Sequence, residues 1–168
     1  MKTKFELEQL LSQMTLEEKV GQLIQIEGNF FNGGTDTLTG PDRNVRIEED
    51  DLKYIGSALN FSCAEEMIDV QKRHLEEDRN RIPLLTMQDV IHGFKTIYPI
   101  PLAMGASFDP SLMAECCRMA AREASASGTQ VTFAPMVDYA RDARWGRVME
   151  TCSEDPYLNS VMGATQVI

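Results

Sequence analysis

The sequence has few basic residues, no long apolar run and no paired cysteine motif. Its 168 residues include 16 Lys and Arg against 26 Asp and Glu, which gives a formal net charge of −10 at pH 7. A surface that follows phosphates needs clustered Lys and Arg, so we expect neither nucleic acid nor an anionic membrane surface as a partner. No apolar run approaches the roughly 20 residues that are needed to span a bilayer.

The N-terminal segment also lacks the continuous apolar stretch of a secretory signal peptide, because Glu6 and Glu8 interrupt it. We therefore expect a cytoplasmic protein. The four cysteines include the adjacent pair Cys116 and Cys117 and form no CxxC motif. This pattern predicts reduced thiols that pack as small hydrophobic residues, rather than a zinc site or a disulfide framework.

Hydrophobic residues make up 43% of the chain and charged residues 25%, which is typical of a folded globular protein. Helix and strand patterns alternate along the chain. We expect helices over 4–13, after the Thr15 and Glu18 capping box, over 64–78, from Asp109 to Gly128 and from Pro156 onward, and short strands within 54–61, 82–87 and 131–137. Residues 28–44 and 88–108 are expected to be irregular, and His74 to be a half-exposed surface residue.

Strand–helix alternation predicts parallel strands joined by crossover helices. A closed (β/α)8 barrel typically takes about 250 residues, and the last helical pattern reaches Ile168 without a capping signal. We therefore expect an α/β fold of the TIM-barrel type, an incomplete (β/α)8 barrel that holds the first three or four strands with their helices. On this interpretation residues 1–168 are a truncated domain.

Polar residues gather directly after two of the predicted strands. The two segments are Gln88–Lys95 and Asp138–Arg147. Ligands of parallel α/β folds bind beyond the carboxyl ends of the strands. Asp89 can accept hydrogen bonds from two hydroxyl groups, Lys95 and Arg147 can donate to the same hydroxyls, and Trp145 offers an apolar face for a sugar ring. The pattern predicts a sugar or polyol site, and the alternative is two solvated loops with incidental charges.

Other chemistry has weaker support in the sequence. Asp89 and His92 are of the types that bind metals, but no third ligand is fixed nearby, so we expect no metal site. Ser107 and Ser153 lack a base in register, which argues against a serine nucleophile.

Four stretches, in order along the chain, resemble the N-terminal part of glycoside hydrolase family 3 enzymes of the β-glucosidase type. They are Met14–Leu23, Asp89–Leu102, Phe133–Asp138, and Arg141–Arg147 followed by Glu150 and Ser153–Tyr157. The matches cover nearly the whole chain. Together they are far more specific than any single motif.

The resemblance implies a retaining glycosidase with a (β/α)8-like barrel that removes terminal β-linked glucose from a β-glucoside or oligosaccharide. No cofactor is expected, because this hydrolysis needs only carboxyl groups and water. The family positions that bind sugar hydroxyls match Asp89, Lys95 and Arg147. Lys95 stands where Arg is common and lacks its planar fork. The resemblance also implies that His92, Arg144 and Trp145 support the loops.

The family's nucleophile and its acid/base cannot be mapped onto these residues, so no catalytic residue is assigned. We therefore expect the chain to be the N-terminal portion of a truncated catalytic domain that does not hydrolyse glycosides by itself. Two alternatives remain open. One is a β-xylosidase or β-N-acetylhexosaminidase of the same family, and the other is a non-catalytic fragment that binds only sugar or a partner chain.

Overall fold

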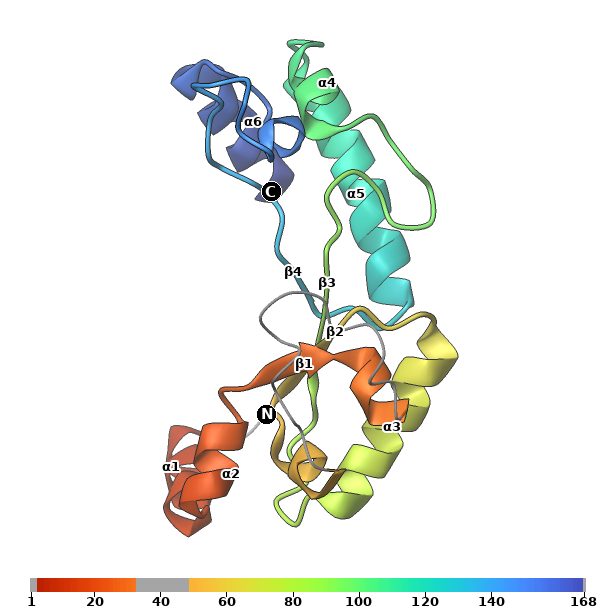
Figure 1. Cartoon of the computed structure of the whole chain (residues 1–168), viewed down its shortest axis with the longest axis vertical. Helices are drawn as coiled ribbons and strands as arrows, with labels where there is room; N and C mark the ends of the chain where they lie inside the picture. The colour runs from red at the N-terminus through yellow and green to blue at the C-terminus, as the bar shows by residue number, and fades with distance from the viewer. Residues whose placement is uncertain (1–2, 33–48, 168) are drawn as a thin grey trace. The chain divides into compact units, whose positions relative to one another are not determined.

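The computed structural model describes residues 3–32 and 49–167, which divide into two compact units, 1–87 and 88–168 (Figure 1). The first unit contains α1 (Lys4–Gln13), α2 (Leu16–Gly21), β1 (Gln25–Glu27), η1 (Gly28–Asn32), η3 (Glu49–Tyr54), β2 (Ser57–Leu59), α3 (Ala64–Glu77) and β3 (Leu85–Gln88), which ends at the boundary. The second contains α4 (Pro101–Gly105), α5 (Pro110–Ala126), β4 (Val131–Thr132), η4 (Val148–Glu150) and α6 (Pro156–Val167).

The strands of the first unit are parallel, as the alternation predicts. β1 pairs with β2 so that Ile26 lies opposite Ala58, and β2 pairs with β3 so that Ala58 lies opposite Thr86. Helix α3 makes the crossover from β2 to β3 and turns Met67 and Val70 into the core. The sequence pattern therefore predicted this arrangement correctly. A short buried strand is followed by a helix with one apolar face and then by a second short strand.

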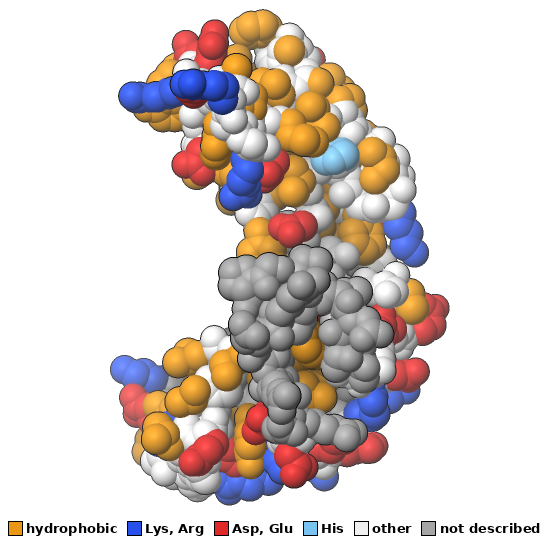
Figure 2. All heavy atoms as spheres, in the orientation of Figure 1, with side chains coloured by type: hydrophobic (Ala, Val, Ile, Leu, Met, Phe, Trp, Pro, Cys, Tyr) orange, Lys and Arg blue, Asp and Glu red, His pale blue; other side chains and the backbone are white. Residues whose placement is uncertain are grey.

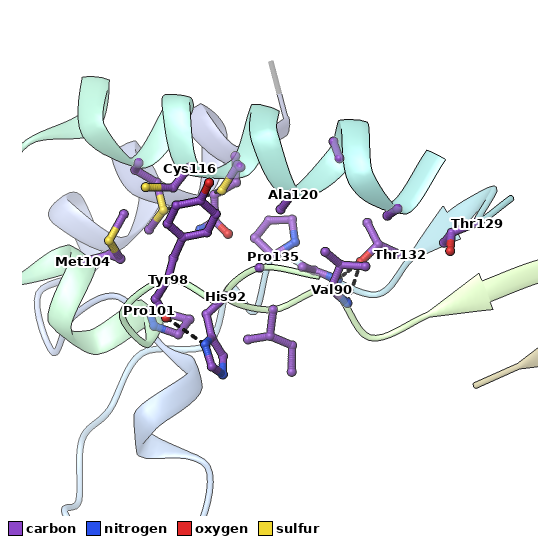
Figure 3. Close-up of a pocket in the computed structure, with 18 of the residues that line it drawn as sticks. Val90, His92, Tyr98, Pro101, Met104, Cys116, Ala120, Thr129, Thr132 and Pro135 are labelled. Atoms are coloured by element: carbon purple, nitrogen blue, oxygen red, sulfur yellow. Dashed lines mark hydrogen bonds between the residues drawn. The ribbon is translucent and has the colours of Figure 1, made fainter. Parts of the chain in front are cut away.

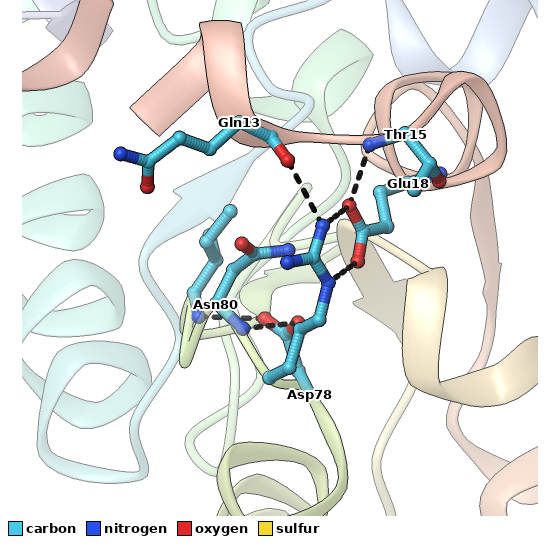
Figure 4. Close-up of polar contacts among 7 residues, drawn as sticks. Gln13, Thr15, Glu18, Asp78 and Asn80 are labelled. Atoms are coloured by element: carbon cyan, nitrogen blue, oxygen red, sulfur yellow. Dashed lines mark hydrogen bonds and ion pairs between the residues drawn. The ribbon is translucent and has the colours of Figure 1, made fainter. Parts of the chain in front are cut away.

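An ion pair between the exposed Arg79 and the buried Glu18 ties the N-terminal helices of the first unit to the end of α3 (Figure 4). Thr15 and Glu18 form the predicted capping box, in which the Thr15 backbone N–H donates to Glu18 Oε2 over 2.7 Å. Arg79 Nη2 donates to the same oxygen over 2.7 Å and to the Gln13 carbonyl over 3.0 Å. Since the Glu18 carboxylate is only 5% exposed, the arginine supplies the charge that its burial requires. The hydrogen bonds from Arg79 and Thr15 lower the pKa of Glu18 to about 2.

The second unit is built on two packed helices. Asp109 begins α5 by accepting a hydrogen bond from the Ser111 backbone N–H over 2.9 Å, with Pro110 in the first turn, as predicted. The core of the second unit contains the side chains of Met104, Met113, Cys152 and Met162. A Cβ at Gly105 would lie 1.7 Å from the Cys152 carbonyl oxygen, so only glycine allows α4 to lie this close to the segment that precedes α6.

The structure confirms most of the predicted elements and corrects several. The irregular interpretation of 88–108 missed α4, and the predicted strand 131–137 is only the two residues of β4. Of the predicted loop 28–44, the described part is the 3-10 helix η1, and 33–44 lie outside the described residues. The cysteines are free thiols, but Cys63 is exposed and caps α3, so it does not pack as a hydrophobic residue.

The prediction of a half-exposed His74 is wrong. The side chain is buried, at 2% exposure, and its Nε2 lies 3.1 Å from the Ile82 carbonyl oxygen. This contact replaces hydration for a ring on the apolar face of α3. Burial also lowers the pKa of His74, which favours the neutral ring.

Large hydrophobic side chains also reach the surface of both units, and Figure 2 shows many of them on the visible face. Leu16, Val20 and Leu23 are 71%, 49% and 88% exposed in the first unit, and Phe133 and Val137 are 48% and 66% exposed in the second. Within 3–32 and 49–167 no helix combines the length and the apolar character that a membrane crossing needs.

The ion pair predicts a specific response to acid. The depressed pKa of Glu18 contributes stability that is complete above its unfolded value near 4.5 and is lost as pH falls toward about 2. We expect Arg79→Ala to lower the melting temperature by a few degrees at pH 7 and to flatten the pH dependence of stability between pH 4.5 and 2. Thermal unfolding followed by circular dichroism measures both. Lys72→Ala, an exposed cation on α3, is the control, and equal effects of the two substitutions would contradict the assignment.

Candidate functional site

The two polar segments predicted from the sequence, Gln88–Lys95 and Asp138–Arg147, lie in the second unit. Beyond the end of β3 at Gln88, neither segment contains a helix or a named strand. Asp89 follows β3 directly and is exposed. Its carboxylate forms no hydrogen bond or ion pair with any residue in the described ranges. The next residue is anchored, because the Val90 N–H donates to Thr132 Oγ1 on β4 over 3.3 Å (Figure 3). The backbone beside Asp89 is therefore held by β4, while the Asp89 carboxylate itself is exposed.

Residues 92–98 form a closed turn. His92 Nδ1 lies 2.9 Å from the Tyr98 carbonyl oxygen, and the Tyr98 N–H donates to the His92 carbonyl over 2.8 Å (Figure 3). Gly93, at φ +114°, pairs with Ile97 across the turn. A Cβ there would lie 2.0 Å from the Thr96 carbonyl oxygen, so glycine is required by both space and conformation. The ring and backbone of His92 thus close the base of the turn that carries Lys95.

A carboxylate on α5 holds the tip of this turn. Glu123 Oε2 accepts hydrogen bonds from the backbone N–H groups of Lys95 and Thr96 over 2.9 and 2.8 Å. Its Oε1 accepts one from Thr96 Oγ1 over 2.6 Å. These bonds, led by the one from the Thr96 hydroxyl, lower the pKa of Glu123. The exposed Lys95 side chain forms no hydrogen bond or ion pair with a described residue.

One buried amide closes the arginine loop, the segment 139–151. Asn159 lies on α6 and is 3% exposed. Its Nδ2 donates to the carbonyls of Val137 and Asp138 over 2.9 and 3.2 Å, and its Oδ1 accepts from the Cys152 N–H over 3.1 Å. The residues before and after the loop are therefore held together by a single side chain.

Within the loop Arg144 and Arg147 are each paired with a neighbouring carboxylate, whereas Arg141 contacts Tyr139. Arg147 donates through Nε and Nη2 to the two oxygens of Glu150, over 2.9 and 2.6 Å. The hydrogen bond from Arg147 lowers the pKa of Glu150. Arg144 forms the same kind of pair with Asp142, on a side chain that is 90% exposed. The Trp145 residue is 36% exposed at the turn between them.

Electrostatics connect the two segments. The pKa of Arg147 is raised, mainly by the hydrogen bond to Glu150 and further by the charges of Asp138 and Asp89. Both carboxylates therefore lie within electrostatic reach of the guanidinium. The charge of Asp89 therefore acts on the Arg147 guanidinium, but no hydrogen bond or ion pair joins these two side chains. The charge of Lys95 interacts with the Glu123 carboxylate.

A separate apolar cavity of about 300 Å³ lies between α5 and the segments that follow β3 and β4 (Figure 3). Its walls include Val90, Tyr98, Met104, Cys116 and Ala120. Asp89, Lys95 and Arg147 do not line this cavity and are exposed at the surface. Among the residues that the structure describes, no group of three or more His, Cys, Asp or Glu side chains is arranged to hold a metal ion.

Sequence reasoning missed the residues that hold the loops. Glu123 and Asn159 were not singled out, because each acts on backbone groups far away in the sequence. Asn159 carried no distinctive signal, since the same predicted helix also contains the polar residues Ser160, Thr165 and Gln166. Glu123 carried no signal either, because a Glu near the end of a helix is usually interpreted as a solvent-exposed charge.

The chain is similar to known proteins both in sequence and in structure. The family profile described as "Glycosyl hydrolase family 3 N terminal domain" matches residues 15–168. The chain is 36% identical over 160 residues to a periplasmic beta-glucosidase of Salmonella typhimurium, covering 94% of this chain and 20% of that protein. It is 32% identical over 126 residues to a beta-xylosidase of Formosa agariphila, covering 69% and 17%.

Among solved structures, the beta-glucosidase of Listeria innocua in complex with isofagomine matches with a TM-score of 0.90 and 44% identity, over 99% of this chain and 22% of that one. A mutant of the same enzyme is described in complex with laminaribiose, and the enzyme itself in complex with glucose. This match and the four strands confirm the expected α/β fold with the first strands of an incomplete barrel.

The chain spans about one fifth of the length of these relatives. Since the family profile covers nearly all of its residues, the chain belongs to glycosyl hydrolase family 3.

Proposed function

We propose that the chain supplies the sugar-binding part of a retaining β-glucosidase, as the N-terminal portion of its catalytic domain. Asp89, Lys95 and Arg147 bind hydroxyl groups of the terminal glucose. The observation that carries the proposal is the exposed Asp89 carboxylate, which has no hydrogen-bond partner among the described residues and whose charge acts on the Arg147 guanidinium that Glu150 orients. The glucose and laminaribiose complexes of the Listeria enzyme support the choice of ligand.

The geometry leaves Arg147 able to donate to a sugar. A guanidinium has five N–H donors, and Glu150 takes one from Nε and one from Nη2, which leaves three. Glu150 therefore fixes the orientation of the guanidinium without exhausting it. Asp89 accepts hydroxyl hydrogen bonds with both oxygens, and the combination of a charged acceptor with a charged donor suits vicinal hydroxyl groups.

The remaining predicted residues have supporting roles. His92 closes the turn that carries Lys95, and Arg144 pairs with Asp142 at the outer side of the arginine loop. Trp145 presents part of its ring to solvent, where an apolar sugar face can stack on it. No metal or cofactor enters the proposal, because the reaction class uses carboxyl groups and water.

A β-xylosidase is the second candidate, because beta-xylosidases of Formosa agariphila are also among the relatives. Glucose and xylose differ by a hydroxymethyl group. Parallel titrations of the chain with the two sugars distinguish the candidates, since a glucosidase site binds glucose more tightly and a xylosidase site does not.

The cytoplasmic location stays a prediction from the sequence. The Salmonella relative is periplasmic by name. Cell fractionation with detection of the chain distinguishes the two locations.

We expect Asp89→Asn to weaken binding of laminaribiose roughly 10- to 100-fold, because a charge-assisted hydrogen bond contributes about 1.5–3 kcal/mol. The change keeps the shape of the side chain and removes its charge. Chemical-shift titration of the isotope-labelled chain measures the affinity. Asp69→Asn, at an exposed site on α3, is the matched control. Equal affinities of the Asp89 variant and the wild-type chain would refute the assignment.

The 168 residues by themselves should bind sugar without hydrolysing it. Retaining hydrolysis needs a nucleophile and an acid/base about 5–5.5 Å apart, and neither family residue maps onto the chain. The assay follows release of the aryl group from an aryl β-glucoside, with heat-denatured chain as the blank. Turnover above that blank would show that catalytic carboxyl groups lie within these residues.

A further inference from the structure

We propose that Glu123 is a positioning residue that orients Lys95 toward the bound sugar, an inference that rests on the proposed function. It acts through the backbone of the 92–98 turn and does not itself touch the ligand. Nothing in the family match or the named relatives assigns it a role.

The contacts use the whole carboxylate. Oε2 receives two consecutive backbone N–H groups, from Lys95 and Thr96, and Oε1 receives the Thr96 hydroxyl. With both oxygens so occupied, the carboxylate attracts the Lys95 ammonium through its charge but forms no ion pair with it. The amine stays available to a ligand while its backbone is held.

The position of Glu123 on α5 supports this interpretation. It lies in the last turn of a helix that spans Pro110–Ala126. The C-terminal end of a helix carries partial negative charge, which disfavours a carboxylate there. The helix therefore gains nothing from this residue, whereas the turn gains three hydrogen bonds.

The turn needs such an anchor at its tip. Its base is closed by His92 and Tyr98, and Gly93 provides the left-handed bend. Beyond the base, the backbone N–H groups at positions 95 and 96 have Glu123 as their partner. Without the carboxylate the tip would move about the base, and the direction of the Lys95 side chain would no longer be fixed.

A double-mutant cycle tests the inference on the full chain, with affinity for laminaribiose measured by chemical-shift titration. The variants are Glu123→Gln, Lys95→Met and the two together. An amide keeps the size of Glu123 but presents an NH2 group to N–H donors. We expect Glu123→Gln to weaken binding roughly 3- to 10-fold and to have no further effect in the Lys95→Met background. Additive losses, or no loss in the single variant, would overturn the inference.

Matched variants separate positioning from general destabilisation. Glu115→Gln, an exposed carboxylate on the same helix, should leave affinity unchanged. Thr96→Ser keeps the hydroxyl donor and should bind like the wild-type chain, whereas Thr96→Val should weaken binding. Equal losses in the serine and valine variants would contradict a role for the hydroxyl bond.

Amide hydrogen exchange tests the anchor without any sugar. The N–H groups of Lys95 and Thr96 should be protected in the wild-type chain and in Glu115→Gln, and exchange faster in Glu123→Gln. Unprotected amides in the wild-type chain would overturn the inference. If they are protected and no sugar binds, the proposed function fails, and the sugar role of Glu123 fails with it.

Discussion

Residues 89–100, which follow β3, and residues 133–147, which follow β4, contain no helix and no named strand, so several of their backbone groups depend on side chains from the helices. Asn159 on α6 meets this need on both sides of the arginine loop, and Glu123 on α5 meets it at the tip of the 92–98 turn. Asn159 is buried, and a buried polar group must find hydrogen-bond partners, which here are carbonyl and N–H groups beside the loop. The helices thereby fix loops that would otherwise be free to move.

Charged side chains of the second unit also hold one another in place. The chain carries an excess of acidic residues, and each arginine of the site is held by a nearby carboxylate. Arg147 is fixed by Glu150 yet keeps N–H donors for a ligand. Asp89 has no such partner among the described residues, which leaves its charge for hydroxyl groups. The expected specificity of this surface depends on the difference between Glu150, which pairs with Arg147, and Asp89, which has no hydrogen-bond or ion-pair partner among the described residues.

Local signals in the sequence were sufficient for most of the fold. The capping box at Thr15 and the Asp109-Pro110 pair located two helix starts, and the apolar face of α3 located part of the core. These features act over a few residues and are visible in the sequence. The missed helix α4 has no polar cap, since Ile100 precedes it, and it is too short to show a period.

Sequence reasoning could point to only some residues of the proposed site, again because it detects patterns that are local in the sequence. Asp89, Lys95 and Arg147 belong to motifs that are contiguous in the sequence, so resemblance to a family located them. Glu123 and Asn159 act across long sequence separations, which no local pattern reports. The burial of His74 was missed likewise, because the Ile82 carbonyl that its ring contacts lies beyond the end of the helix.

The central claim is that Asp89 and Arg147 together bind one sugar. A crystal structure of the chain soaked with laminaribiose tests it most directly. The account predicts the terminal glucose with its hydroxyl groups within hydrogen-bond distance of both side chains, and with the Arg147–Glu150 pair intact. A sugar bound elsewhere, or contacting neither residue, would contradict it.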